Sequence, residues 1–208
     1  MDVKQGDVAE ERFVSVLQDA VRAIEEGGIP YAMIGGIPSV VLGRPRWSSN
    51  EDIDFFVKPE DAKKVLEALG DAGFQTEERD PQWLYKAKKD GVVVDVIFRS
   101  SGDFYLDDEM IQRAFIGEFK GQKLRMLAPE DLVVMKALAH KEDTPQYWHD
   151  ALSIIGRAEL DWDYLLGRAQ IGPRRVLSLL LYAQSNDLAV PDRTIRGLFE
   201  MIYDSGGR

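Results

Sequence analysis

The sequence predicts a mixed α/β fold followed by an all-helical C-terminal part. Before residue 128, short apolar runs with strand-like alternation are interspersed with segments whose apolar residues recur at helical spacing. After that point the apolar segments have helical spacing, and several of them begin at a proline. We therefore expect a small mixed β-sheet with flanking helices in residues 1–128 and a helical part in residues 129–208.

The first part is expected to alternate between helices and strands. Apolar spacing, with glycine and proline at the boundaries, predicts helices at residues 9–26, 37–42, 59–69 and 107–115. Strands are predicted at residues 31–34, 52–57, 83–87, 91–98, 116–119 and 123–127, with hairpin turns at Asp90-Gly91 and Gly121. The second part is expected to hold a helix that begins at Pro129 and further helices at residues 145–157, 163–169, 173–184 and 191–203.

Composition excludes several function classes. The formal net charge of -10 argues against a general nucleic-acid binder, whose affinity comes from lysine and arginine at phosphates. The chain has no cysteine, so disulfides and thiolate chemistry are excluded. The start of the sequence is polar and acidic, unlike a signal peptide, and no apolar run is long enough for a membrane helix. A cytoplasmic protein with no membrane partner is the expectation.

Three aspartates in predicted strands are the strongest chemical signal. Asp52 and Asp54 stand two positions apart, so in a strand their side chains point to the same face. Asp95 stands alone in a valine-rich run, where an unpartnered carboxylate is costly. A divalent cation such as Mg²⁺, which takes oxygen ligands, would satisfy all three.

A glycine pair, Gly35-Gly36, lies between the first predicted strand and the following helix. Glycines at such a junction allow backbone N–H groups to approach a phosphate closely. Together with metal-binding carboxylates, this turn points to phosphoryl or nucleotidyl transfer. Each feature also has a plainer interpretation: the glycines as a turn, the Asp52–Asp54 pair as a solvated strand end or a helix cap, and Asp95 as an edge-strand charge that opposes aggregation.

The order of these motifs resembles the nucleotidyltransferase superfamily related to DNA polymerase beta. Within it, the chain is similar to the minimal nucleotidyltransferases and abortive-infection-type toxins over about residues 31–165. The motifs that carry the resemblance are Ile34-Gly35-Gly36, Gly43-Arg44-Pro45-Arg46, Asp52-Ile53-Asp54-Phe55, Val94-Asp95-Val96, Leu127-Ala128-Pro129-Glu130-Asp131-Leu132 with Lys136, and Trp148-His149-Asp150-Ala151-Leu152.

The resemblance implies roles for the carboxylates. Asp52 and Asp54 would bind a pair of Mg²⁺ ions, and Asp95 would bind one of these ions and help deprotonate the acceptor hydroxyl. It also implies a small mixed sheet of the nucleotidyltransferase type, with residues 1–128 as the catalytic core and residues 129–208 as the helical C-terminal part.

The resemblance also implies a nucleotide site. Gly35 and Gly36 would hold the triphosphate, with Ser39 as a further donor, and Lys136 suits the β- and γ-phosphates. Asp150 would then support Lys136 or cap a helix.

The loop before the carboxylates departs from the family pattern. The resemblance implies that Arg46 in this loop binds phosphate. Residues 47–51 make the loop about two residues longer than the usual Arg-x-Thr-x-Asp spacing, which would displace Arg46 from that position. Trp47 in the same loop either stacks on a base or packs on the domain.

The function implied is Mg²⁺-dependent transfer of a nucleoside monophosphate from an NTP, such as ATP, to an acceptor hydroxyl, with release of pyrophosphate. The acceptor could be a protein, a small molecule or tRNA. The alternative is a non-catalytic nucleotide-binding module, or a toxin–antitoxin module with an antitoxin partner, on the same fold.

Overall fold

The computed structural model describes residues 5–48 and 50–203, and the described chain divides into two compact units. Unit 1 comprises the described residues up to Val41, Pro45–Arg99 and Tyr105–Leu127. Unit 2 comprises Leu42–Arg44, Ser100–Phe104 and the described residues from Ala128 onward. Two short segments from the first part of the sequence thus belong to the helical unit.

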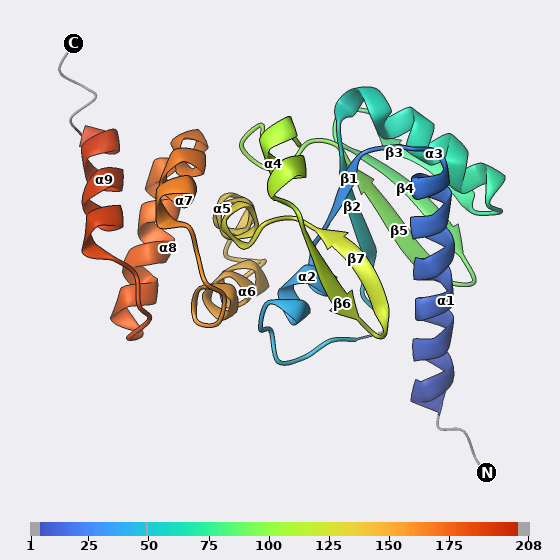
Figure 1. The fold of residues 1–208 in the computed structure, drawn as a ribbon, viewed down its shortest axis with the longest axis horizontal. Coiled ribbons are helices and arrows are strands. Elements are labelled where there is room, and N and C mark those ends of the chain that lie inside the picture. Colours follow the sequence, from blue (N-terminus) through green and yellow to red (C-terminus); the bar gives the residue numbers. More distant parts are fainter. Residues whose placement is uncertain (1–4, 49, 204–208) are drawn as a thin grey trace. The chain divides into compact units, whose positions relative to one another are not determined.

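A seven-stranded mixed sheet forms the centre of unit 1 among the described residues (Figure 1). The spatial order is β3-β4-β5-β2-β1-β7-β6. Strand β2 pairs with β5 in parallel and with β1 antiparallel, and β1 also pairs with β7 in parallel. The strands are β1 (Tyr31–Ile34), β2 (Ile53–Val57), β3 (Gln75–Asp80), β4 (Leu84–Lys89), β5 (Val92–Ile97), β6 (Phe115–Phe119) and β7 (Gln122–Met126).

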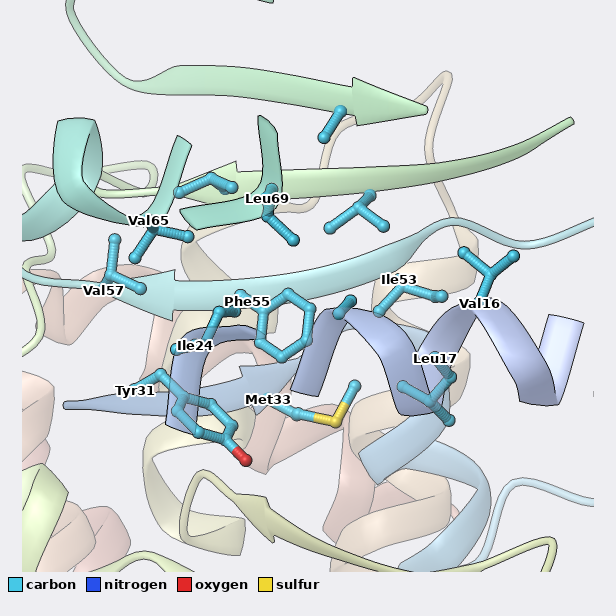
Figure 2. Packing of buried hydrophobic residues seen from close by; sticks show 14 of the residues in the cluster. Val16, Leu17, Ile24, Tyr31, Met33, Ile53, Phe55, Val57, Val65 and Leu69 are labelled. Carbon is cyan, nitrogen blue, oxygen red and sulfur yellow. The ribbon is translucent and has the colours of Figure 1, made fainter. Parts of the chain in front are cut away.

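Helices α1 (Gln5–Glu26) and α3 (Ala62–Asp71) cover one face of this sheet and enclose the main hydrophobic core (Figure 2). Strand β2 shows how the sequence divides the faces, because Ile53, Phe55 and Val57 all point into this core. Alternation along a strand sends Asp54 to the opposite face. Packing on this core therefore fixes the backbone of the strands whose opposite face carries the carboxylates.

Shorter helices complete unit 1. They are α2 (Gly36–Val41), the 3-10 turn η1 (Pro59–Asp61) and α4 (Asp108–Arg113). Asp107 caps the N-terminus of α4: its carboxylate accepts a hydrogen bond from the Met110 backbone N–H at 2.9 Å.

Unit 2 contains the helices α5 (Pro129–Ala139), α6 (Gln146–Ile155), α7 (Trp162–Arg168), η2 (Ala169–Ile171), α8 (Pro173–Ser185) and α9 (Asp192–Tyr203). Helix α5 is its buried centre. Its Asp131 side chain is fully enclosed, where it accepts a hydrogen bond from the Tyr164 hydroxyl at 2.9 Å and pairs with Arg168 at 3.0 Å. A buried carboxylate needs such partners to stay charged.

The predicted fold class is confirmed, a mixed α/β sheet with flanking helices and a helical C-terminal part. Both hairpin turns form as predicted, with positive φ at Asp90-Gly91 and at Lys120-Gly121. Strand β3 was not predicted, because its sequence QTEERD is polar on both faces. It lies at the edge of the sheet, where charged side chains oppose pairing with another chain.

No helix among the described residues is long and apolar enough to cross a membrane.

The assignment of catalysis to residues 1–128 stays a prediction.

Candidate active site

The pairing of β4, β5 and β2 brings charged side chains into one row on the sheet face opposite the α1–α3 core. In the strand register Lys86 is opposite Asp95, and Asp95 is opposite Asp54. Asp54 in turn is opposite Ile34, the last residue of β1 before the glycine pair. Asp54 and Asp95, which are far apart in the sequence, are thereby neighbours, as expected if both belong to one site.

Asp95 is paired with Lys86. The Lys86 Nζ donates to both carboxylate oxygens of Asp95, at 2.6 and 3.0 Å. Only 12% of the Asp95 side chain is exposed, so this charge needs a close partner. The expectation that Asp95 requires a cation is therefore met in this structure by a lysine ammonium.

Asp52 lies at the open side of the same cluster. Its carboxylate is 3.9 Å from the Lys86 Nζ, and 44% of its side chain is exposed. Burial raises the pKa of the Asp52 carboxyl above its ordinary value, the Asp95 carboxylate raises it further, and the Lys86 ammonium lowers it. The Asp95 carboxylate thus repels the charge of ionised Asp52, and Lys86 reduces this repulsion.

Gly35 allows Asp54 to take its place in the row. A Cβ built on Gly35 would overlap the Asp54 carboxylate, and the Gly35 φ of +74° lies in the left-handed region that favours glycine. The Ser39 hydroxyl donates to the Gly35 carbonyl at 2.6 Å and fastens the turn from within α2. The glycine is required here for close packing against a carboxylate as well as for the turn.

Ser39 and Gly36, which are predicted to bind phosphate, both have structural roles at the glycine turn. Ser39 is fully buried, and its hydroxyl serves the Gly35 carbonyl. Gly36 is the first residue of α2. Their contacts with phosphate stay predictions, whereas their structural part in the glycine turn is plain.

The carboxylates match Mg²⁺ in chemistry, since Asp52, Asp54 and Asp95 supply only hard oxygen donors from one sheet face. Among residues 5–48 and 50–203, however, no three carboxylate or imidazole side chains lie close enough to hold a metal ion as they stand. Lys86 lies within this group of charges. Metal binding by these residues requires local rearrangement of side chains.

The loop before β2 carries the other candidates from unit 1. Arg46 is exposed. Trp47 packs edge-to-face on Phe13 and Phe119, with ring centroids 4.9 and 5.2 Å apart, and the Lys120 ammonium lies over its ring. Of the two roles considered for Trp47, packing on the domain is the one present. The nucleotide contact of Arg46 stays a prediction.

Lys136 belongs to unit 2, where it is buried on α5. Its Nζ donates to the Asp150 carboxylate on α6 at 2.8 Å, and only 5% and 8% of the two side chains are exposed. Arg44 approaches the same carboxylate at 3.8 Å. The expected support of Lys136 by Asp150 is present, and its contact with phosphate stays a prediction.

Lys86 was missed by the sequence analysis, although the signal was there. A two-residue turn at Asp90-Gly91 pairs Lys89 with Val92 across the hairpin. Each residue earlier in the first strand then pairs with one residue later in the second, so Lys86 is opposite Asp95. The search for a partner of Asp95 considered only metals.

A family model described as "uncharacterised nucleotidyltransferase" matches residues 4–185. The chain belongs to this nucleotidyltransferase family. It is therefore a transferase, and the reaction class is transfer of a nucleoside monophosphate. The resemblance to the nucleotidyltransferase superfamily is thus confirmed.

The solved structures to which this chain is similar share little of its sequence. The antibiotic-resistance factor ANT(2'')-Ia matches with a TM-score of 0.50 and 15% identity, over 83% of this chain and 91% of that one. The lincosamide antibiotic adenylyltransferase LnuA matches with a TM-score of 0.49 and 16% identity, over 69% and 97%. An antigenic nucleotidyltransferase-like protein from Paracoccidioides brasiliensis matches with a TM-score of 0.49 and 15% identity, over 88% and 90%. No curated protein matches the chain significantly.

Proposed function

We propose that this nucleotidyltransferase moves a nucleoside monophosphate from a Mg²⁺-bound NTP to an acceptor hydroxyl and releases pyrophosphate. The observation that carries the proposal is the register of Asp54 opposite Asp95, with Gly35 packed directly against the Asp54 carboxylate. This arrangement joins the predicted metal ligands and the predicted phosphate turn in one place. The catalytic site is then in unit 1.

The three carboxylates would hold the metal, with Asp52 and Asp54 as principal ligands and Asp95 as a third. When bound, Mg²⁺ neutralises charge on the reacting phosphates and aligns the attacking and leaving oxygens. Asp95 would accept the proton of the acceptor hydroxyl. The new bond joins the acceptor oxygen to the α-phosphorus, and the bond to the pyrophosphate oxygen breaks.

The remaining residues would bind and orient the nucleotide. Gly35 and Gly36 present backbone at the strand end, where a side chain on Gly35 would collide with Asp54. Arg46, which is exposed in unit 1, would supply positive charge for phosphate. The predicted phosphate contact of Lys136 is not part of this proposal, because Lys136 lies in unit 2 and is buried against Asp150. The acceptor is a protein, a small molecule or tRNA, and the net charge of -10 weighs against tRNA.

A label-transfer assay tests this function. Each of the four NTPs, labelled at the α-phosphate, is incubated with Mg²⁺ and a panel of protein, tRNA and small-molecule hydroxyl acceptors. Wild type is expected to transfer the label and release pyrophosphate, whereas Asp54→Asn loses at least a hundredfold of this activity. Asp71→Asn, which removes an exposed carboxylate at the end of α3, is the matched control and retains activity.

Label transfer to an acceptor with equal rates in wild type and Asp54→Asn would contradict the proposed site. Nucleotide binding without transfer to any acceptor class would favour the non-catalytic module. A toxin–antitoxin pairing has no support from these observations.

A further inference from the structure

The carboxylate cluster already contains a cation, the ammonium of Lys86. Its Nζ lies 2.6 Å from one Asp95 oxygen and 3.9 Å from an Asp52 oxygen. It therefore bridges two of the three residues assigned to the metal. A Mg²⁺ ion approaches its oxygen ligands to about 2.0–2.1 Å, so it needs the same carboxylate surface that the ammonium covers.

The fold fixes the backbone of Lys86, whereas the end of its side chain can change position. Antiparallel pairing holds its backbone directly opposite Asp95. Its side chain is 31% exposed, whereas the Asp95 side chain is 12% exposed. A long, partly solvated lysine chain has other rotamers available, so the ammonium can leave the cluster while the carboxylate cannot.

Two positive groups cannot share this cluster without cost. A divalent ion placed beside Asp95 would lie within a few ångströms of the ammonium, where like charges repel strongly in a partly buried site. The metal must displace Lys86 or accept fewer carboxylate ligands. Triphosphate oxygens add negative charge and further ligands, which favours the metal over the ammonium.

We propose that Lys86 competes with the divalent cation for Asp95 and Asp52, so that the metal site forms fully only when the nucleotide arrives with its metal. Lys86 is then a positioning residue that holds the Asp95 carboxylate in place while no substrate is bound. The inference rests on the proposed function, because it concerns the same carboxylates. Competition by Lys86 would couple metal binding to nucleotide binding.

The test measures Mn²⁺ affinity of the whole chain without nucleotide, by electron paramagnetic resonance of free Mn²⁺. Wild type is compared with Lys86→Met, with Lys86→Gln and with Lys88→Met. Lys88 lies two positions along the same strand, on the same face, opposite Val93. It is the matched control, because its loss removes the same charge without touching Asp95. Lys86→Gln keeps a hydrogen-bond donor beside Asp95 and serves if Lys86→Met folds poorly.

Both Lys86 variants are expected to bind Mn²⁺ at least tenfold more tightly than wild type, and Lys88→Met to remain within about twofold of wild type. Adding a non-hydrolysable NTP should reduce the difference between wild type and the Lys86 variants. Unchanged or weaker Mn²⁺ binding by both Lys86 variants, alongside clear binding by wild type, would overturn the competition and leave the proposed function standing. Absence of Mn²⁺ binding in every protein, with or without nucleotide, would overturn both.

Discussion

The Asp54 carboxylate fills the space in which a side chain on Gly35 would have to lie. Gly35 follows the last residue of β1 in a left-handed conformation, and Asp54 is on the neighbouring strand opposite Ile34. The glycine pair and the Asp-x-Asp motif, which are separated by the fifteen residues between Gly36 and Asp52, are thus in direct contact in the fold. This contact explains why the two motifs occur together: the glycine makes room for the carboxylate.

The first prediction follows from this contact. Gly35→Ala adds a clash with Asp54 to the cost of a left-handed residue, which is about 1–2 kcal/mol by itself. Gly28→Ala is the matched control, because its φ of +63° carries the same backbone cost while nothing lies within 4 Å of the added Cβ. Both variants should unfold at lower denaturant concentration, Gly35→Ala more so, and Gly35→Ala alone should lose at least tenfold in nucleotide transfer.

A double variant separates the clash from the backbone strain. Gly35→Ala combined with Asp54→Ala should recover part of the stability lost by Gly35→Ala, because the colliding side chain is removed. Additive effects of the two substitutions on the free energy of unfolding would contradict the steric account.

The second prediction concerns the pH dependence of activity. Asp52 must be ionised to bind a metal, and its pKa is raised by burial and by Asp95, so activity should fall as pH drops through a value above that of an ordinary aspartate. Lys86 lowers this pKa, so Lys86→Gln should move the acid limb of kcat/KM to higher pH. Lys88→Gln should leave it in place. Titration of the nucleotide itself is common to these proteins and cancels in the comparison.

The third prediction is that Asp52→Asn does not destabilise the fold at neutral pH. A raised pKa means that folded Asp52 binds its proton more tightly than unfolded Asp52, so above that pKa the ionised carboxyl reduces the free energy of unfolding. Removing the charge should raise Tm at pH 7, by at most about 3 °C because solvent screens a half-exposed group. The gain should shrink as the pH falls through the folded pKa and vanish below the lower, unfolded pKa. A clear fall in Tm at pH 7 would contradict this sign.

The fourth prediction concerns the buried pair in unit 2. Asp150→Ala leaves the Lys136 ammonium almost fully buried, with its carboxylate partner removed, which typically costs about 3–5 kcal/mol. Lys64→Ala breaks the Asp61 ion pair, formed at a similar distance but with an exposed lysine, and should barely change the denaturant midpoint. Equal effects of the two substitutions would mean that burial does not determine the strength of the Lys136–Asp150 pair.

Sequence reasoning located the strands that carry Asp54 and Asp95 because their apolar residues alternate or run together, which is what burial on a sheet requires. It missed β3, whose stability comes from pairing with β4 at an edge and leaves no apolar pattern. It did not foresee that the Ser39 hydroxyl donates to the Gly35 carbonyl, because a hydrogen bond inside a turn leaves no pattern in the sequence; the phosphate contact of Ser39 stays a prediction. It missed Lys86 because a long-range ion pair becomes visible only when strand pairing is counted out.

The central claim is that Asp54 belongs to a metal-bridged nucleotide site. Calorimetric titration of each non-hydrolysable NTP with Mg²⁺ into wild type, Asp54→Asn and Asp71→Asn tests it most directly. We predict binding by wild type and Asp71→Asn for at least one base, at least tenfold weaker binding by Asp54→Asn, and no such difference when Mg²⁺ is withheld. Equal affinity of wild type and Asp54→Asn in the presence of Mg²⁺ would contradict the claim.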